Sequence, residues 1–334
     1  MLNHLLFPKP LITTSFAHYV SLGLACIYVG SLYLSKNARI SLNGKGAKPR
    51  RPNVAMRDEP DVIRARLLAV SIATVACCLA VLGVVWESVS WRMTSLDIVL
   101  DSVMLRLGFP IASIGPITTN IPSILPHLIT PLLFLGPLFA GFLSHELPGQ
   151  RNWRWQSHIV GRFFSLHGIR NYWIGPITEE VVFRACILAV YHMSGASNMR
   201  MIFWSPLLFG LAHVHHAIDT FYAKGGDWDA AKVALFGTLF QLSYTSLFGF
   251  YASFLFLRTG SILPPITAHI FCNVMGIPMI GYELRRHAKY RNYIKAMYLA
   301  GIIGFVYTLG KWTKTKDNLY WLQEGETKYA VFRY

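Results

Sequence analysis

Apolar segments long enough to cross a bilayer recur along the chain, separated by short polar stretches. A bilayer core is crossed by about 20 apolar residues in a helix, and the segments cluster near that length. A further segment, residues 96–107, is more mixed and predicts a helix lying at the membrane interface. We predict about eight membrane-spanning helices, over residues 11–35, 65–89, 128–143, 172–193, 201–217, 232–257, 262–281 and 294–309.

Composition supports the same interpretation. The chain has 334 residues, of which 53% are hydrophobic and only 14% charged, with a mean hydropathy of +0.40. Soluble domains are about one-quarter charged, so a large soluble helical core is excluded. The predicted fold class is all-α, a polytopic membrane bundle of about eight spans. Because no internal repeat or linker is visible, we predict a single integral membrane domain over residues 1–334.

The net charge of +15 bears on how the chain is oriented in the membrane. Basic residues gather in short loops at residues 36–60, 151–170 and 285–291. If the eight predicted spans cross the membrane in alternating directions, these loops all lie on one side. Short basic loops remain in the cytoplasm, so the amino terminus is expected on the opposite side. Lys311, Lys314 and Lys316 fit this alternation less well. The basic loops indicate contact with membrane lipid and no nucleic-acid partner.

The five cysteines all fall in apolar segments without metal-ligand spacing. The sequence therefore indicates neither a disulfide framework nor a structural zinc site.

The predicted fourth span carries charged residues in an apolar helix. Glu180 and Arg184 stand four residues apart and can pair along one face, which leaves Glu179 as a carboxylate without a local partner. An ionisable group inside a span is costly and usually functional. Glu179 is therefore the first candidate for chemistry.

Two later spans add polar groups to the same region. His213 lies near the cytoplasmic end of the fifth span, and His269 and Asn273 share one face of the seventh. A glutamate can take a proton from water and return it to a leaving amine, and His213 can share that transfer. His269 and the Asn273 amide can donate hydrogen bonds to an oxyanion. The set suits peptide hydrolysis inside a membrane.

Three ordered motifs carry these residues, and together they resemble the type II CAAX prenyl proteases, within the wider group of CAAX proteases and bacteriocin-processing enzymes. The likeness covers about residues 172–281, the predicted catalytic core. The motifs are Glu179-Glu180-x-x-x-Arg184, Phe209-Gly210-Leu211-Ala212-His213-Val214-His215-His216, and His269-Ile270-Phe271-Cys272-Asn273 followed by Gly276 and Pro278.

The resemblance implies a multi-pass protease of the endoplasmic reticulum whose active site faces the cytoplasm. Such enzymes remove the last three residues of farnesylated or geranylgeranylated CaaX proteins, such as Ras-type small GTPases. It further implies that Glu179 and His213 activate water, that His269 and Asn273 stabilise the transition state, and that Glu180 and Arg184 support them. No cofactor or metal is implied.

Several alternatives remain open. His213 with His215 and His216 could bind a metal, although the HExxH pattern is absent. His215 and His216 are also typical of interfacial helix ends, and Cys272 of inert packing in an apolar helix. A non-catalytic scaffold that binds prenylated partners would need the same cavity. A proton-coupled transporter would predict inverted repeats, which the sequence does not show.

Overall fold

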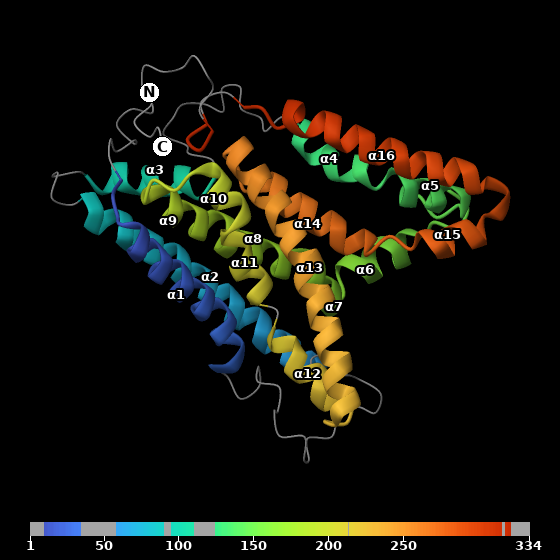
Figure 1. Ribbon diagram of the computed structural model, residues 1–334, viewed down its shortest axis with the longest axis horizontal. Coiled ribbons are helices and arrows are strands. Elements are labelled where there is room, and N and C mark those ends of the chain that lie inside the picture. The colour runs from blue at the N-terminus through green and yellow to red at the C-terminus, as the bar shows by residue number, and fades with distance from the viewer. Residues whose placement is uncertain are drawn as a thin grey trace.

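The computed structural model describes residues 10–34, 58–89, 95–109, 124–212, 214–315 and 318–321. All elements in these ranges are helices, as Figure 1 shows, so the predicted all-α class is confirmed. The main helices are α1 (Thr14–Leu34), α2 (Pro60–Val89), α3 (Leu96–Arg106), α4 (Leu125–Leu133), α5 (Leu135–Leu143), α10 (Asn198–Phe203), α11 (Ser205–Leu211), α12 (His215–Ala223), α13 (Trp228–Thr259), α14 (Leu263–Met275), α15 (Ile280–Arg286) and α16 (Arg291–Trp312).

Four helices in the described ranges are long and apolar enough to span a membrane, and two bent pairs raise that number to six. The four are α1, α2, α13 and the helix that ends at Trp312, and the pairs are α4 with α5 and α14 with α15. The protein is thus a polytopic membrane protein. The number eight stays a prediction, as do the domain limits and the interfacial position of α3. The predicted basic loop at 36–60 lies mostly outside the described residues.

The apolar segment at 128–143 forms two helices that meet at 66°. Pro137 has no N–H to donate to the Leu133 carbonyl, so the helical ladder is interrupted just after Phe134. Helix α16 packs against this bend, and a Cβ on its Gly301 would lie 2.9 Å from the Leu132 carbonyl oxygen. The glycine therefore permits the close approach of the two backbones.

The seventh predicted span also bends, by 50°, between α14 and α15. Gly276 ends α14 with a φ of 67°, a left-handed conformation that favours glycine. Pro278 follows within the connection and cannot continue a helix.

The predicted fourth span is the central element of the fold. Its residues, 172–193, belong to a longer run of helical segments, which we call the central helix. This run consists of α7 (Leu166–Gly168), η5 (Ile169–Ile174), α8 (Gly175–Glu180), η6 (Val181–Cys186) and α9 (Ile187–Met193), in which η5 and η6 are π-helical. Residues 181–190 are all buried. Helices α1, α2, α11, α13 and α14 contact its segments, and Figure 1 shows α8 and α9 inside the bundle. A helix that is apolar all round is expected at such a position.

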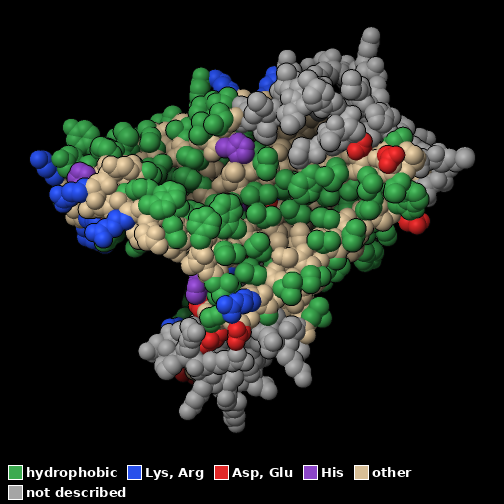
Figure 2. All heavy atoms as spheres, turned by 180° about the vertical axis from the view of Figure 1, so that it is seen from behind, with side chains coloured by type: hydrophobic (Ala, Val, Ile, Leu, Met, Phe, Trp, Pro, Cys, Tyr) green, Lys and Arg blue, Asp and Glu red, His purple; other side chains and the backbone are tan. Residues whose placement is uncertain are grey.

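Hydrophobic side chains cover much of the described part of the face seen in Figure 2. Leu235, Phe236 and Leu247 of α13, for example, are 57%, 70% and 65% exposed. Such a surface suits contact with lipid chains and would be unfavourable in water.

Candidate active site

Glu180 and Arg184 form a buried ion pair in the central helix. The Nη1 of Arg184 lies 3.1 Å from Glu180 Oε1, and the two side chains are only 1% and 0% exposed. The guanidinium carbon lies 4.1 Å from the centroid of the Phe209 ring, in cation–π geometry. The pairing expected from their spacing is therefore present, and Phe209 of the second motif packs on it.

Gly249 of α13 gives the Arg184 guanidinium its space. A Cβ at Gly249 would lie 2.6 Å from the Pro206 Cβ and 3.3 Å from Arg184 Nη2. The first distance is shorter than carbon atoms tolerate, so a side chain here would move α11, Arg184 or both.

We expect Gly249→Ala to destabilise the protein by about 1–3 kcal/mol, the usual cost of overpacking a filled core. Gly237→Ala is the matched control, because it lies on the same helix and a Cβ there meets no atom within 4 Å. The control should be neutral or more stable by up to about 1 kcal/mol, since alanine favours helix. Thermal unfolding in detergent measures both variants, and equal effects would contradict this packing argument.

His269 of α14 lies between the two glutamates. Its Nδ1 is 2.7 Å from Glu180 Oε1, and its Nε2 is 3.9 Å from Glu179 Oε2. The first contact is a hydrogen bond and fixes the ring orientation, whereas the second is too long for a direct bond. Glu180 Oε1 therefore accepts from both Arg184 and His269. The spacing in the sequence links Glu180 only to Arg184 and gives no sign of its contact with His269.

Glu179 lies on a cavity of about 420 Å³. Its side chain is 25% exposed, in contrast with the fully buried Glu180. The difference agrees with a carboxylate that can meet a substrate. The cavity is lined by Tyr28, Val29, Leu32, Arg66, Leu67, Val70, Arg170, Asn171, Gly175, Pro176, Glu179, Phe183, Phe209, Ala212 and Asn273.

Helix α1 closes one side of this cavity through a direct contact with the central helix. The hydroxyls of Tyr28 and Thr178 lie 2.9 Å apart, and Thr178 also donates to the Ile174 carbonyl at 2.6 Å. The Tyr28 ring meets Phe183 edge to face, with centroids 5.7 Å apart. These contacts place the first helix of the chain beside Glu179, which sequence reasoning did not foresee.

Asn273 lies on the same cavity as Glu179. Its Nδ2 donates to the Asn171 carbonyl oxygen at 2.8 Å, which fixes the position of the amide. An amide nitrogen carries two N–H groups, so this bond leaves chemical capacity for one more. The structure thus brings Glu179, Glu180, Arg184, His269 and Asn273 into one region.

His213 lies outside the described residues, and so do the side chains of His215 and His216. Within the described part of the chain, no group of three or more His, Cys, Asp or Glu residues could hold a metal ion. Because His213 is not among the described residues, its roles as a partner of Glu179 and as a metal ligand both stay predictions.

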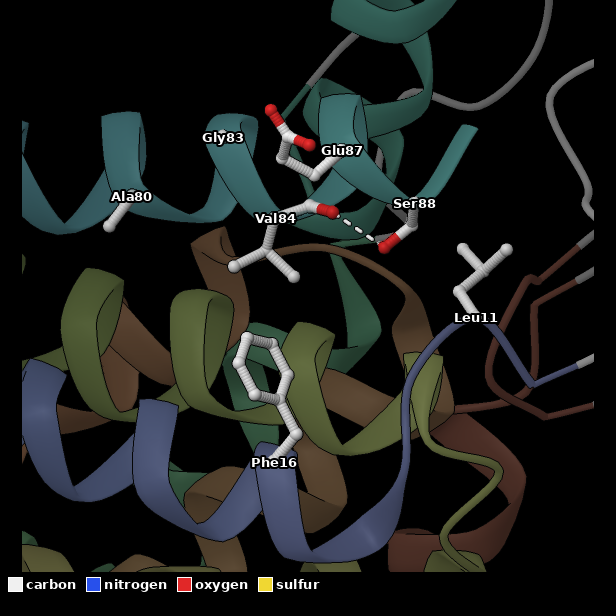
Figure 3. A pocket seen from close by; sticks show the side chains of 7 residues that line it. All are labelled: Leu11, Phe16, Ala80, Gly83, Val84, Glu87 and Ser88. Atoms are coloured by element: carbon white, nitrogen blue, oxygen red, sulfur yellow. Dashed lines mark hydrogen bonds between the residues drawn. The ribbon is translucent and has the colours of Figure 1, made fainter. Parts of the chain in front are cut away.

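A second groove lies at the opposite ends of α1 and α2. It has a volume of about 490 Å³, and Figure 3 shows its lining, with Ser88 donating to the Val84 carbonyl at 2.6 Å. Glu87 is the only ionisable residue among those that line it. A single carboxylate does not supply an acid–base pair, so we assign this groove no chemistry.

A comparison with known proteins finds a family whose match contains the motif residues from Glu179 to Asn273. Residues 161–275 match the family model described as type II CAAX prenyl endopeptidase Rce1-like. The chain is 33% identical over 303 residues to the CAAX prenyl protease 2 of Homo sapiens, covering 88% of this chain and 80% of that protein. It is 30% identical over 294 residues to the probable CAAX prenyl protease 2 of Schizosaccharomyces pombe, covering 88% and 92%. No solved structure matches the chain significantly.

Proposed function

Because this chain belongs to the type II CAAX prenyl endopeptidase family, we propose that it removes the terminal aaX tripeptide from farnesylated or geranylgeranylated CaaX proteins through water activated by Glu179. The arrangement that supports this mechanism is the imidazole of His269, bonded to buried Glu180 and facing the more accessible Glu179.

In this mechanism Glu179, with His213, takes a proton from water as the water oxygen attacks the carbonyl carbon of the prenylated cysteine of the substrate. The C=O electron pair moves to oxygen and forms a tetrahedral oxyanion. The oxyanion accepts hydrogen bonds from an N–H of Asn273 and from Nε2–H of His269 in its imidazolium form, in which Nδ1 still donates to Glu180. Each well-placed donor contributes about 3–4 kcal/mol. The oxyanion then collapses, the C–N bond breaks, and the proton passes to the leaving amine of the tripeptide.

Glu180 has an orienting role in this scheme. A carboxylate that accepts from Nδ1 directs Nε2 of the same ring toward the reacting groups. The 3.9 Å between Nε2 and Glu179 Oε2 is short enough for one water oxygen to bond with both at about 2.8 Å each. Arg184 balances the charge of Glu180 within the core.

We further propose an endoplasmic-reticulum location, an active site that faces the cytoplasm, and Ras-type small GTPases among the substrates. The prenyl chain partitions into lipid, which would keep the scissile bond close to the interface. The family resemblance and the basic loops support these assignments.

Release of the terminal tripeptide from a farnesylated CaaX peptide tests the function. We expect purified protein to release it, and expect a strong chelator to leave the rate unchanged within about twofold, since the proposed groups act without metal. The same peptide without its farnesyl group is the control substrate and should react more slowly. Chelator-sensitive release would favour the alternative metal site at His213. Binding without any release would instead favour a scaffold.

A further inference from the structure

Two arginines lie on the same cavity as Glu179. Arg66 comes from the first two turns of α2, and Arg170 from η5 at the start of the central helix. Most of the other lining residues are apolar, including Val29, Leu67 and Val70. The volume of about 420 Å³ falls within the range of about 300–1,000 Å³ that holds small ligands. The cavity therefore combines one carboxylate with apolar walls and two cations.

Arg170 is held in place by neighbouring polar groups. Its Nη1 lies 2.8 Å from Asp58 Oδ1, and its Nε donates to Asn171 Oδ1 at 2.9 Å. The contact with Asp58 shows that a carboxylate reaches this guanidinium at hydrogen-bonding distance. A guanidinium carries five N–H donors in a planar fork, and so can bond more than one carboxylate oxygen.

The spacing of these groups matches the length of the leaving tripeptide. Nine residues separate Arg170 from Glu179 in the central helix, which places their Cα atoms at most about 13 Å apart along the axis, because the π-helical η5 rises less per residue than the about 1.5 Å of an α-helix. Asn171, Gly175 and Glu179 line the cavity at intervals of four, so they follow one face of that helix. Three extended residues span about 10 Å. The separation of Arg170 and Glu179 exceeds this length by at most about 3 Å, which is the length of one hydrogen bond.

We propose that Arg66, supported by Arg170, binds the free carboxylate of the last substrate residue and thereby sets the length of the peptide that is released. This rests on the proposed function, because only a CaaX substrate puts that carboxylate three residues from the cleaved bond. The two aliphatic residues lie along the apolar walls, and the carboxylate lies at the end away from Glu179, where like charges would repel. Arg66 is a specificity residue and takes no part in proton transfer.

The test compares two farnesylated peptides that differ only at the carboxyl terminus, one a free acid and one a carboxamide. We expect native protein to cleave the acid with a kcat/KM at least about 10-fold higher, since a charged hydrogen bond contributes about 1.5–3 kcal/mol. In Arg66→Gln the acid should lose this advantage, so that its kcat/KM falls to that of the amide. Arg64→Gln is the matched control, because Arg64 lies on the same helix, 69% exposed and paired with Asp61 at 3.4 Å.

Amide cleavage also reports folding, since an unfolded variant would lose both activities. If Arg66→Gln does not fold, Arg66→Lys replaces it, and a reduced acid-to-amide ratio supports the proposal because lysine lacks the planar fork. The proposal is overturned if native protein cleaves acid and amide equally, or if replacing Arg66 leaves their ratio at the native value. Failure of native protein to cleave either peptide contradicts the proposed function itself, a separate result.

Discussion

Glu179→Gln should lower tripeptide release by at least about 100-fold, because glutamine keeps the shape of the side chain but cannot accept a proton from water. General-base catalysis contributes about 10²–10⁴-fold, which sets the expected size of the loss. Folding should be little affected, since the Glu179 side chain is 25% exposed and lies 3.9 Å from His269. Release from the farnesylated acid peptide under single-turnover conditions measures the effect.

The control for this variant is Glu87→Gln, which changes the same side chain in the remote groove between α1 and α2. It should react at the native rate. Substrate affinity, measured by fluorescence of a labelled farnesyl peptide, should stay within about twofold in both variants, because Glu179 acts on water and not on the peptide. Native turnover by Glu179→Gln would show that Glu179 is not the general base. His213 would then be the remaining candidate.

Arg184→Met should destabilise the protein by about 3–5 kcal/mol, because it leaves the Glu180 charge buried without its cation. Both side chains are almost completely buried, at 1% and 0% exposed. Arg286→Met is the matched control. The pair it breaks, with Glu146 at 2.9 Å, is 42% and 44% exposed and should be worth no more than about 1 kcal/mol. Thermal and chemical unfolding in detergent provide the comparison.

Adding Glu180→Gln to Arg184→Met separates stability from chemistry. The double variant should regain most of the lost stability, since it removes the unpaired charge. Its activity should stay about 10–100-fold below native, because His269 then lacks the carboxylate that orients its ring. A double variant that is both stable and fully active would show that Glu180 does not position His269. Loss of stability equal to that of the single variant would contradict the charge argument.

The sequence predicts the long helices well because a single property, the length of an apolar segment, determines them. Helices α1, α2, α13 and α16 are continuous apolar segments, and hydrophobic length is visible in any window of the sequence. The bend at Phe134 depends on Pro137, which is also visible, but its angle depends on how α16 packs against it. The π-helical turns of η5 and η6 leave no comparable pattern.

The motif residues of the candidate site can be named from the sequence, but their contacts and the cavity residues of α1 and α2 cannot. The Glu180–Arg184 pair follows from a spacing of four, because that distance is fixed by the helix. The bond from His269 to Glu180 joins residues 89 apart and depends on how α14 is rotated against α8. Arg66 joins the cavity for a similar reason, since nothing in α2 marks which face meets the central helix. Contacts between residues four apart in one helix follow directly from the sequence. The rotation of one helix against another depends on packing throughout the bundle.

The walls of the cavity come from widely separated parts of the chain, from Tyr28 in α1 to Asn273 in α14. The Tyr28–Thr178 and Asn171–Asn273 contacts that hold it together close loops of 150 and 102 residues. Membrane helices are synthesised and inserted from the amino terminus onward. A ribosome must therefore deliver α14 to the bilayer before the cavity is complete, and every shorter nascent chain lacks the wall that Asn273 supplies.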